Sequence, residues 1–154
     1  MKIKLLLLLG LVSLSVFAQQ KTADSLKAVL GKSKNDIDKA VLLNAISTEY
    51  KATDPKLMQD FAAKALELSK KIKYRIEEGN AYLNLGNSNI ILGNYPKALE
   101  CFSKAQEVFE SELNATTENK DAVKNGLARA YGSIGIVFSE QSNYSKALQF
   151  HLKA

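Results

Sequence analysis

The sequence of 154 residues contains one cysteine, one histidine and no tryptophan. A single cysteine excludes an internal disulfide framework, and with a single histidine it also excludes the Cys and His clusters of zinc sites. Two prolines and eight glycines are too few for a collagen-like or linker-like chain. Neither sign of charge dominates, because 21 Lys and Arg residues are nearly balanced by 16 Asp and Glu residues, which gives a formal net charge of +5. No basic patch interleaved with aromatics is present, so we expect no nucleic-acid partner.

Long hydrophobic runs are scarce too, and the one that exists lies at the start of the chain. Lys2 and Lys4 precede an apolar run from Leu5 to Phe17, which ends in the small residue Ala18. This order of a basic, an apolar and a small-residue segment predicts a secretory signal peptide over residues 1–18. The alternative is a permanent membrane anchor, but 14 helical residues reach only roughly 21 Å. A hydrocarbon core is about 30 Å thick, so cleavage after Ala18 is favoured.

The signal peptide predicts that the protein is exported to the periplasm or cell envelope. No cysteine stands directly after the apolar run, where Gln19 and Gln20 are found, so a lipoprotein anchor is not expected. The rest of the chain has no second run long enough to cross a bilayer, so we expect no membrane span in the mature chain. Cys101 is then an unpaired thiol in an exported protein, and its favoured interpretation is a small buried apolar residue.

Helical periodicity dominates from Asp24 onward. Apolar residues recur three and four positions apart, as in Phe61, Ala65 and Leu68, and strand-like alternation is not sustained anywhere. We therefore predict an all-α fold, with a short lead-in helix in residues 19–35. Short segments rich in Gly, Pro, Asn, Asp and Ser separate the helices. One of them contains Asp54 and Pro55, which predicts a capped helix that begins with proline.

Two segments of the chain resemble each other closely. Residues 94–105 read NYPKALECFSKA and residues 143–154 read NYSKALQFHLKA, which agree at 7 of 12 positions. The preceding helices match as well, with AYLNLG at 81–86 against AYGSIG at 130–135. A third, more diverged copy lies upstream, where Ile46 and Tyr50 precede Asp54.

On these residues the chain resembles the tetratricopeptide repeat family, whose unit is a helix–turn–helix of about 34 residues. The resemblance implies a right-handed superhelix of antiparallel helix pairs, with repeats at 36–73, 77–112 and 120–154 and the last one truncated. It is similar to the long-helix type found in exported bacterial proteins and in sensor regions of membrane histidine kinases and regulators. The residues that match the packing pattern of the family are Tyr82, Leu85, Gly86, Ala98, Phe102, Ala105, Tyr131, Gly135, Tyr144, Ala147 and Ala154. His151 stands where the family usually has Phe or Tyr.

No combination of residues predicts catalysis, a cofactor or a metal site. A Ser/His/Asp set is implausible with His151 as the only histidine, and no Walker or dinucleotide-binding loop is present. We interpret the pair Glu77 and Glu78 as a solvated helix exterior. The chain is therefore predicted not to be an enzyme.

A binding groove is the remaining candidate site. In the family, the first helices of the units line the concave side of the superhelix. Asn80, Asn84 and Asn87 share one helix face, and Asn44, Arg129 and Ser133 occupy comparable positions in the other copies. The resemblance implies that these six side chains contact a peptide, whose backbone an amide can both donate to and accept from. The alternative is that Asn84 and Asn87 bridge neighbouring helices or face water.

The function that follows is an exported scaffold that binds a protein or peptide. A more specific form is the N-terminal sensory part of a larger envelope signalling protein. The alternative is a structural module in which copies of the chain stack on one another. Ala154 falls at the last small packing position of a unit, so we expect further repeats or a partner to cover the C-terminal end, where Phe138, Phe150 and Leu152 are candidates for the open face.

Overall fold

A computed structural model describes residues 21–115 and 118–154, and every regular element in them is a helix. The predicted signal peptide, residues 1–18, lies outside the described residues. Residues 21–32 are helical and precede the other elements. These are α2 (Asp36–Glu49), the short 3-10 helix η1 (Tyr50–Ala52), α3 (Pro55–Lys71), α4 (Arg75–Ile91), α5 (Tyr95–Ala115), α6 (Lys120–Glu140) and α7 (Tyr144–His151). The predicted all-α class is confirmed.

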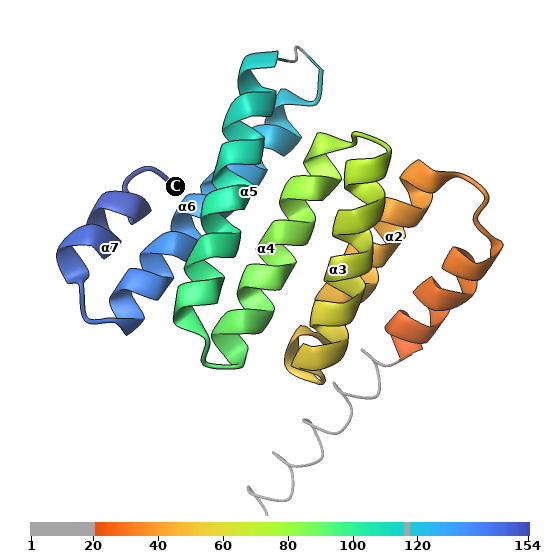
Figure 1. Cartoon of the computed structure of the whole chain (residues 1–154), viewed down its shortest axis with the longest axis horizontal. Coiled ribbons are helices and arrows are strands. Elements are labelled where there is room, and N and C mark those ends of the chain that lie inside the picture. Colours follow the sequence, from red (N-terminus) through yellow and green to blue (C-terminus); the bar gives the residue numbers. More distant parts are fainter. Residues whose placement is uncertain (1–20, 116–117) are drawn as a thin grey trace, which may run out of the picture.

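The helices form three successive antiparallel pairs, α2 with α3, α4 with α5 and α6 with α7. They stand in a row that runs from the orange N-terminal helices at one end to blue α7 at the other (Figure 1). The first helices of the pairs, α2, α4 and α6, also contact one another in succession, and we call them the inner helices. This arrangement is the α-solenoid that the repeats predict.

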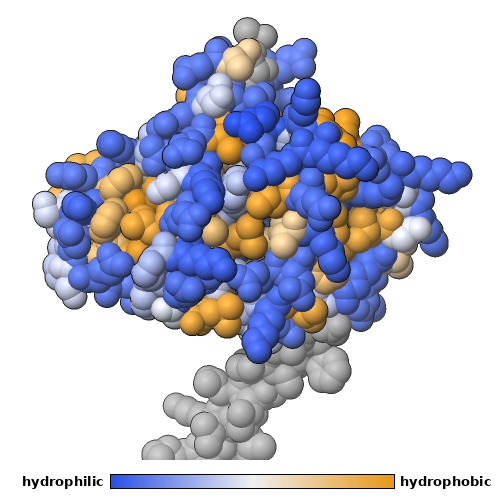
Figure 2. All heavy atoms as spheres, viewed as in Figure 1, coloured by the Kyte–Doolittle hydropathy of each residue, from blue (hydrophilic) through white to orange (hydrophobic). Residues whose placement is uncertain are grey.

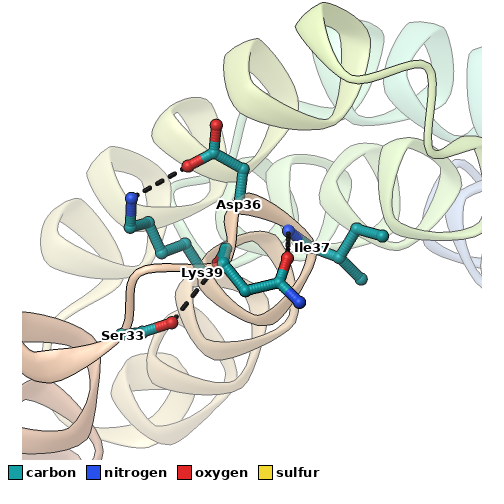
Figure 3. Close-up of polar contacts among 5 residues, drawn as sticks. Ser33, Asp36, Ile37 and Lys39 are labelled. Atoms are coloured by element: carbon teal, nitrogen blue, oxygen red, sulfur yellow. Dashed lines mark hydrogen bonds and ion pairs between the residues drawn. The ribbon is translucent and has the colours of Figure 1, made fainter.

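Side-chain caps start several of the helices. The Asp54 carboxylate accepts hydrogen bonds from the backbone N–H groups of Lys56 and Leu57, both at 3.0 Å, directly before Pro55. This confirms the predicted start of α3. The start of α2 lies around the labelled Ile37 in Figure 3, and there the Asn35 side chain accepts a bond from the Ile37 N–H at 2.9 Å. Four of the described helices thus begin directly after an Asn or Asp whose side chain accepts a backbone N–H, the other two being α5 after Asn94 and α7 after Asn143.

The turn within the second pair and the turn within the third pair have the same backbone conformation. Gly93 has a φ of 75° and Ser142 has a φ of 59°, both in the left-handed region. In each turn the next residue donates its N–H to the carbonyl five residues back, Asn94 to Asn89 and Asn143 to Phe138, both at 2.8 Å. The third pair therefore uses serine at a position where glycine has no steric penalty.

Glycines let aromatic rings lie against the inner helices. A Cβ atom on Gly86 would lie 2.3 Å from Cε1 of Phe102, and one on Gly135 would lie 2.7 Å from Cε1 of His151. The lone histidine thus packs where the other copy has Phe102, as predicted. The side chain of Phe109 is fully buried between two glycines of different helices.

Phe109 joins three helices. A Cβ atom would lie 2.5 Å from its Cζ atom if built on Gly79 in α4, and 2.3 Å if built on Gly126 in α6. The ring comes from α5, so both neighbouring inner helices give up a side chain to admit it. The packing pattern that we derived from the repeats does not include Phe109, although it holds the second and third pairs together.

Most of the predicted packing residues lie inside the array. Those that are buried are Tyr82, Gly86, Ala98, Phe102, Ala105, Gly135 and Ala147, and those that are half-buried are Leu85 and Tyr131. The prediction is wrong for Tyr144 and Ala154. Tyr144 is 70% exposed because no described helix lies beyond the third pair to cover it. Its counterpart Tyr95 is half-buried and donates a hydrogen bond to Glu140 at the end of α6.

Ala154 is exposed because α7 ends at His151 and leaves it beyond the helix. The open end of the third pair carries other apolar side chains. Leu148 is 61% exposed and Leu152 is 79% exposed. Phe138 and Phe150, expected on this face, are half-buried and stack with their ring centroids 5.6 Å apart. At the end where Figure 1 places α7, Figure 2 shows hydrophobic residues on a largely hydrophilic face.

Candidate ligand-binding groove

A cavity of about 220 Å³ lies against the three inner helices, and we call it the central cavity. α2, α4 and α6 each contribute to it. Its lining residues are Val41, Asn44, Ala45, Thr48, Glu77, Asn80, Asn84 and Arg129. Four of the six side chains predicted to contact a peptide, Asn44, Asn80, Asn84 and Arg129, are therefore together in one cavity.

The amides of Asn44 and Asn84 connect α2 to α4. The Asn84 amide nitrogen donates to the Asn44 backbone carbonyl at 3.2 Å and to the Asn44 side-chain oxygen at 3.3 Å. Both side chains are buried. Asn84 thus bridges neighbouring helices, which is the alternative that the sequence left open for it. Because buried amides require partners, this bridge also fixes the spacing of the two inner helices.

Glu77 forms the floor of the same network. Its carboxylate accepts a bond from the Asn44 amide at 2.7 Å and another from the Asn80 amide at 3.1 Å. Its exposed fraction is only 8%, and Glu78 next to it is also buried. The interpretation of this pair as a solvated helix exterior is therefore wrong. Asn44 on α2 lies against Glu77, whereas Glu78 faces α5 and pairs with Arg75 at 2.6 Å.

Arg129 lies at the rim of the central cavity. Its guanidinium donates to the Asn80 side-chain oxygen at 3.2 Å, which connects α6 to α4. The Arg129 side chain is exposed, in contrast to the buried carboxylate of Glu77. The cavity therefore has a negative group in its floor and a positive group at its edge.

A second cavity, of about 490 Å³, lies between the helical residues 21–32 and α2, and we call it the N-terminal cavity. It is lined by Val29, Lys32, Ser33, Asp38, Val41 and Leu42. Val41 lines both cavities, so the two adjoin along α2. Val29 and Val41 present half or nearly half of their surface to solvent.

A family model described as tetratricopeptide repeat matches residues 77–154. The chain belongs to the tetratricopeptide repeat family. The crystal structure of the TPR domain of Arabidopsis FLU has the same fold, with a TM-score of 0.63 at 23% sequence identity over 76% of this chain and 92% of that one. No curated protein matches the chain.

Membership of the tetratricopeptide repeat family makes the fold one of a protein-interaction scaffold, and such domains are typically non-catalytic. Residues 21–115 and 118–154 hold no group of three or more His, Cys, Asp and Glu side chains that could bind a metal ion. In the same part of the chain, no helix is both long and hydrophobic enough to span a bilayer.

Two of the predicted groove residues of this repeat protein lie elsewhere. Asn87 and Ser133 are half-buried and do not line the central cavity. Sequence reasoning in turn missed Glu77, although it precedes Asn80 by three residues and Asn84 by seven. That spacing places it on the same helix face as the amides, so the signal was present.

Cys101 lies on α5, away from both cavities, and is buried as predicted. Burial raises the pKa of its thiol, and the nearby charge of Glu100 adds to the effect. A thiol with a raised pKa carries little thiolate at neutral pH and is a poor nucleophile.

Proposed function

We propose that the protein is an exported, non-catalytic scaffold that binds an extended segment of another protein along its inner helices. The observation that carries the proposal is the central cavity, in which all three inner helices contribute polar side chains. Amide and carboxylate groups in a concave site match the alternating donors and acceptors of an extended peptide backbone. The adjoining N-terminal cavity offers apolar surface for a side chain of the same segment.

Blocking the central cavity tests this proposal. Ala45 lines the cavity, whereas Ala63 is exposed on α3 and lines neither cavity. The full chain, as processed by an exporting host, would select binders from a random peptide display library. We expect Ala45→Tyr to abolish binding of the selected peptides and Ala63→Tyr to leave their dissociation constants unchanged. Equal affinities for the two variants would refute the groove as the binding site.

The export part of the proposal is supported by the basic and apolar character of residues 1–18. The more specific form is a sensory segment of an envelope signalling protein, suggested by the similarity to long-helix repeats of such proteins. Intact mass measurement on protein recovered from the envelope fraction should give a chain that begins at Gln19. A chain that retains residues 1–18, or that stays in the cytoplasm, would contradict export.

Self-assembly is the second candidate function, favoured by the exposed apolar side chains Tyr144, Leu148 and Leu152. The first two lie one turn apart on α7, and Leu152 follows one turn later at its end. A second copy of the chain would remove this stripe from water. Light scattering after size-exclusion chromatography should then show dimers or larger species that Leu148→Glu dissociates. A wild-type chain that stays monomeric at high concentration would exclude this function.

A further inference from the structure

The charge of Glu77 has no cationic partner in the described part of the chain. Its two hydrogen-bond donors, Asn44 and Asn80, are neutral amides. The ion pairs among residues 21–115 and 118–154 involve other carboxylates, those of Asp24, Asp36, Glu78 and Glu100. A carboxylate that is almost fully buried is costly unless an opposite charge balances it. The Glu77 carboxylate is therefore buried without an ion pair among the described residues, and a positively charged group beside it would be stabilising.

Glu77 can still accept hydrogen bonds. An ionised carboxylate offers about four acceptor positions, and the two amides use one on each oxygen. Since Glu77 lines the central cavity, a group that enters the cavity can reach its free acceptor positions. A cationic nitrogen would form charge-assisted bonds there, which are about twice as strong as neutral ones.

None of the other charged groups that line the two cavities forms an ion pair with Glu77. Arg129 at the rim bonds to Asn80 rather than to Glu77. Lys32 and Asp38 line the N-terminal cavity and not the central cavity that holds Glu77. A negatively charged ligand group is disfavoured beside Glu77, because the amides of Asn44 and Asn80 already donate to that carboxylate and its charge would repel an anion.

The N-terminal cavity adds a second requirement. Val29, Val41 and Leu42 supply apolar surface on its walls, and Val41 also borders the central cavity. A single extended segment can therefore place an apolar side chain against these residues and a neighbouring group beside Glu77. Burial of apolar surface contributes affinity, while the buried carboxylate selects among segments by charge.

We propose that the groove selects a peptide segment that carries a cationic nitrogen next to an apolar side chain, with the cation bound at Glu77. The cation is the ammonium group of a Lys side chain or of a free peptide N-terminus. This inference rests on the proposed peptide-binding function and specifies its ligand. Glu77 is the specificity-determining residue, and Asn44 and Asn80 position its carboxylate.

A positional-scanning peptide array tests the inference with the labelled full chain. Each spot fixes one residue of a heptapeptide, and parallel arrays carry acetylated or free N-termini. We expect spots with fixed Lys to bind at least tenfold more strongly than spots with fixed Glu on the acetylated array. A preference that appears only with free N-termini would assign the ammonium to the peptide terminus instead. Binding without any preference for positive charge would overturn the inference but leave the proposed function standing, whereas absence of binding to all spots would overturn both.

Solution affinities of one selected peptide then locate the contact. Glu77→Gln keeps an acceptor for Asn44 but removes the charge, and should weaken binding roughly ten- to a hundredfold. The matched control is Glu67→Gln, an exposed glutamate on α3 that lines neither cavity, and it should leave the affinity unchanged.

A further arm uses only the wild-type chain, so it holds even if Glu77→Gln fails to fold. For a peptide that binds through lysine, Nε-acetylation of that lysine should weaken binding by the same factor as Glu77→Gln. For a peptide that binds through its N-terminus, acetylation of the terminus should do so. Unchanged affinity after acetylation would overturn the inference.

Discussion

Replacing Gly126 by alanine should destabilise the chain, whereas the same replacement at Gly132, six residues later on α6, should stabilise it. Both glycines lie inside one long helix, so helix propensity favours alanine at each by about 1 kcal/mol. They differ only in what a new methyl group would meet. At Gly132 the nearest heavy atom within 4 Å is the Cβ atom of Ala154, at 3.9 Å. At Gly126 it is the ring of Phe109.

The cost at Gly126 follows from the packing of that ring. An added Cβ would lie 2.3 Å from the Phe109 Cζ atom, whereas ordinary van der Waals contact is 3.4–4 Å. The fully buried ring cannot retreat toward α4, because Gly79 already approaches it from that side. Overpacking of this kind costs about 1–3 kcal/mol, and we take the upper end because both sides are fixed. After the propensity gain, we expect a net loss of about 2 kcal/mol in the free energy of unfolding.

Urea unfolding followed by circular dichroism measures these changes for the wild type and both variants. In a thermal scan followed by the same signal, the melting temperature of Gly126→Ala should lie roughly 4–8 °C below that of the wild type. In a Phe109→Leu background the same substitution should cost at least about 1 kcal/mol less, because the smaller side chain leaves room for the methyl group. If Gly126→Ala is as stable as the wild type, or costs the same in both backgrounds, contact with Phe109 is not the reason for the glycine.

Three further predictions concern the turn, the bridge and the hydroxyl group of Tyr131. Ser142→Gly should raise the free energy of unfolding by about 1 kcal/mol, because it removes a side chain from a left-handed backbone position; a loss in urea titration would contradict this. Asn84→Ala should cost about 1–3 kcal/mol in the same assay through the lost bridge to α2, whereas half-buried Asn87→Ala should change it by less than about 0.5 kcal/mol. The hydrogen bond from Tyr131 to Glu110, at 2.6 Å, raises the pKa of the tyrosine from 10.0 to about 12. Its stabilising effect is therefore complete below about pH 10 and is lost as the pH rises through about 12, so Tyr131→Phe should flatten the decline in stability over that interval.

Much of the fold could be predicted from the sequence because its signals are local. Asp54 before Pro55 identifies the start of α3, since a side-chain cap and the first helical turn involve only adjacent residues. The similarity of residues 94–105 to 143–154 identifies two equivalent helix pairs for the same reason. Helical spacing also placed the amides of Asn80 and Asn84 on one face, and the structure places both in the central cavity.

The errors concern positions whose surroundings come from other parts of the chain. Tyr95 and Tyr144 follow the same local pattern, but among the described helices only Tyr95 has a following pair beside it, and only Tyr95 is half-buried. Charge suggested that Glu77 faces water, yet contacts from α2 bury its carboxylate. Phe109 escaped notice because its two glycine partners lie on different helices, one before it and one after it in the sequence.

The sequence by itself determined the helices, their caps, the repeat and hence the tetratricopeptide architecture, because hydrophobic spacing and capping act within a few residues. Only the tertiary structure decided which faces meet. It turned Asn84 into a bridge to α2, buried Glu77 beneath a polar cavity and left Leu148 in water at the end of the array. Burial depends on which neighbouring helix covers a side chain, and that is a property of the assembled array rather than of any one helix.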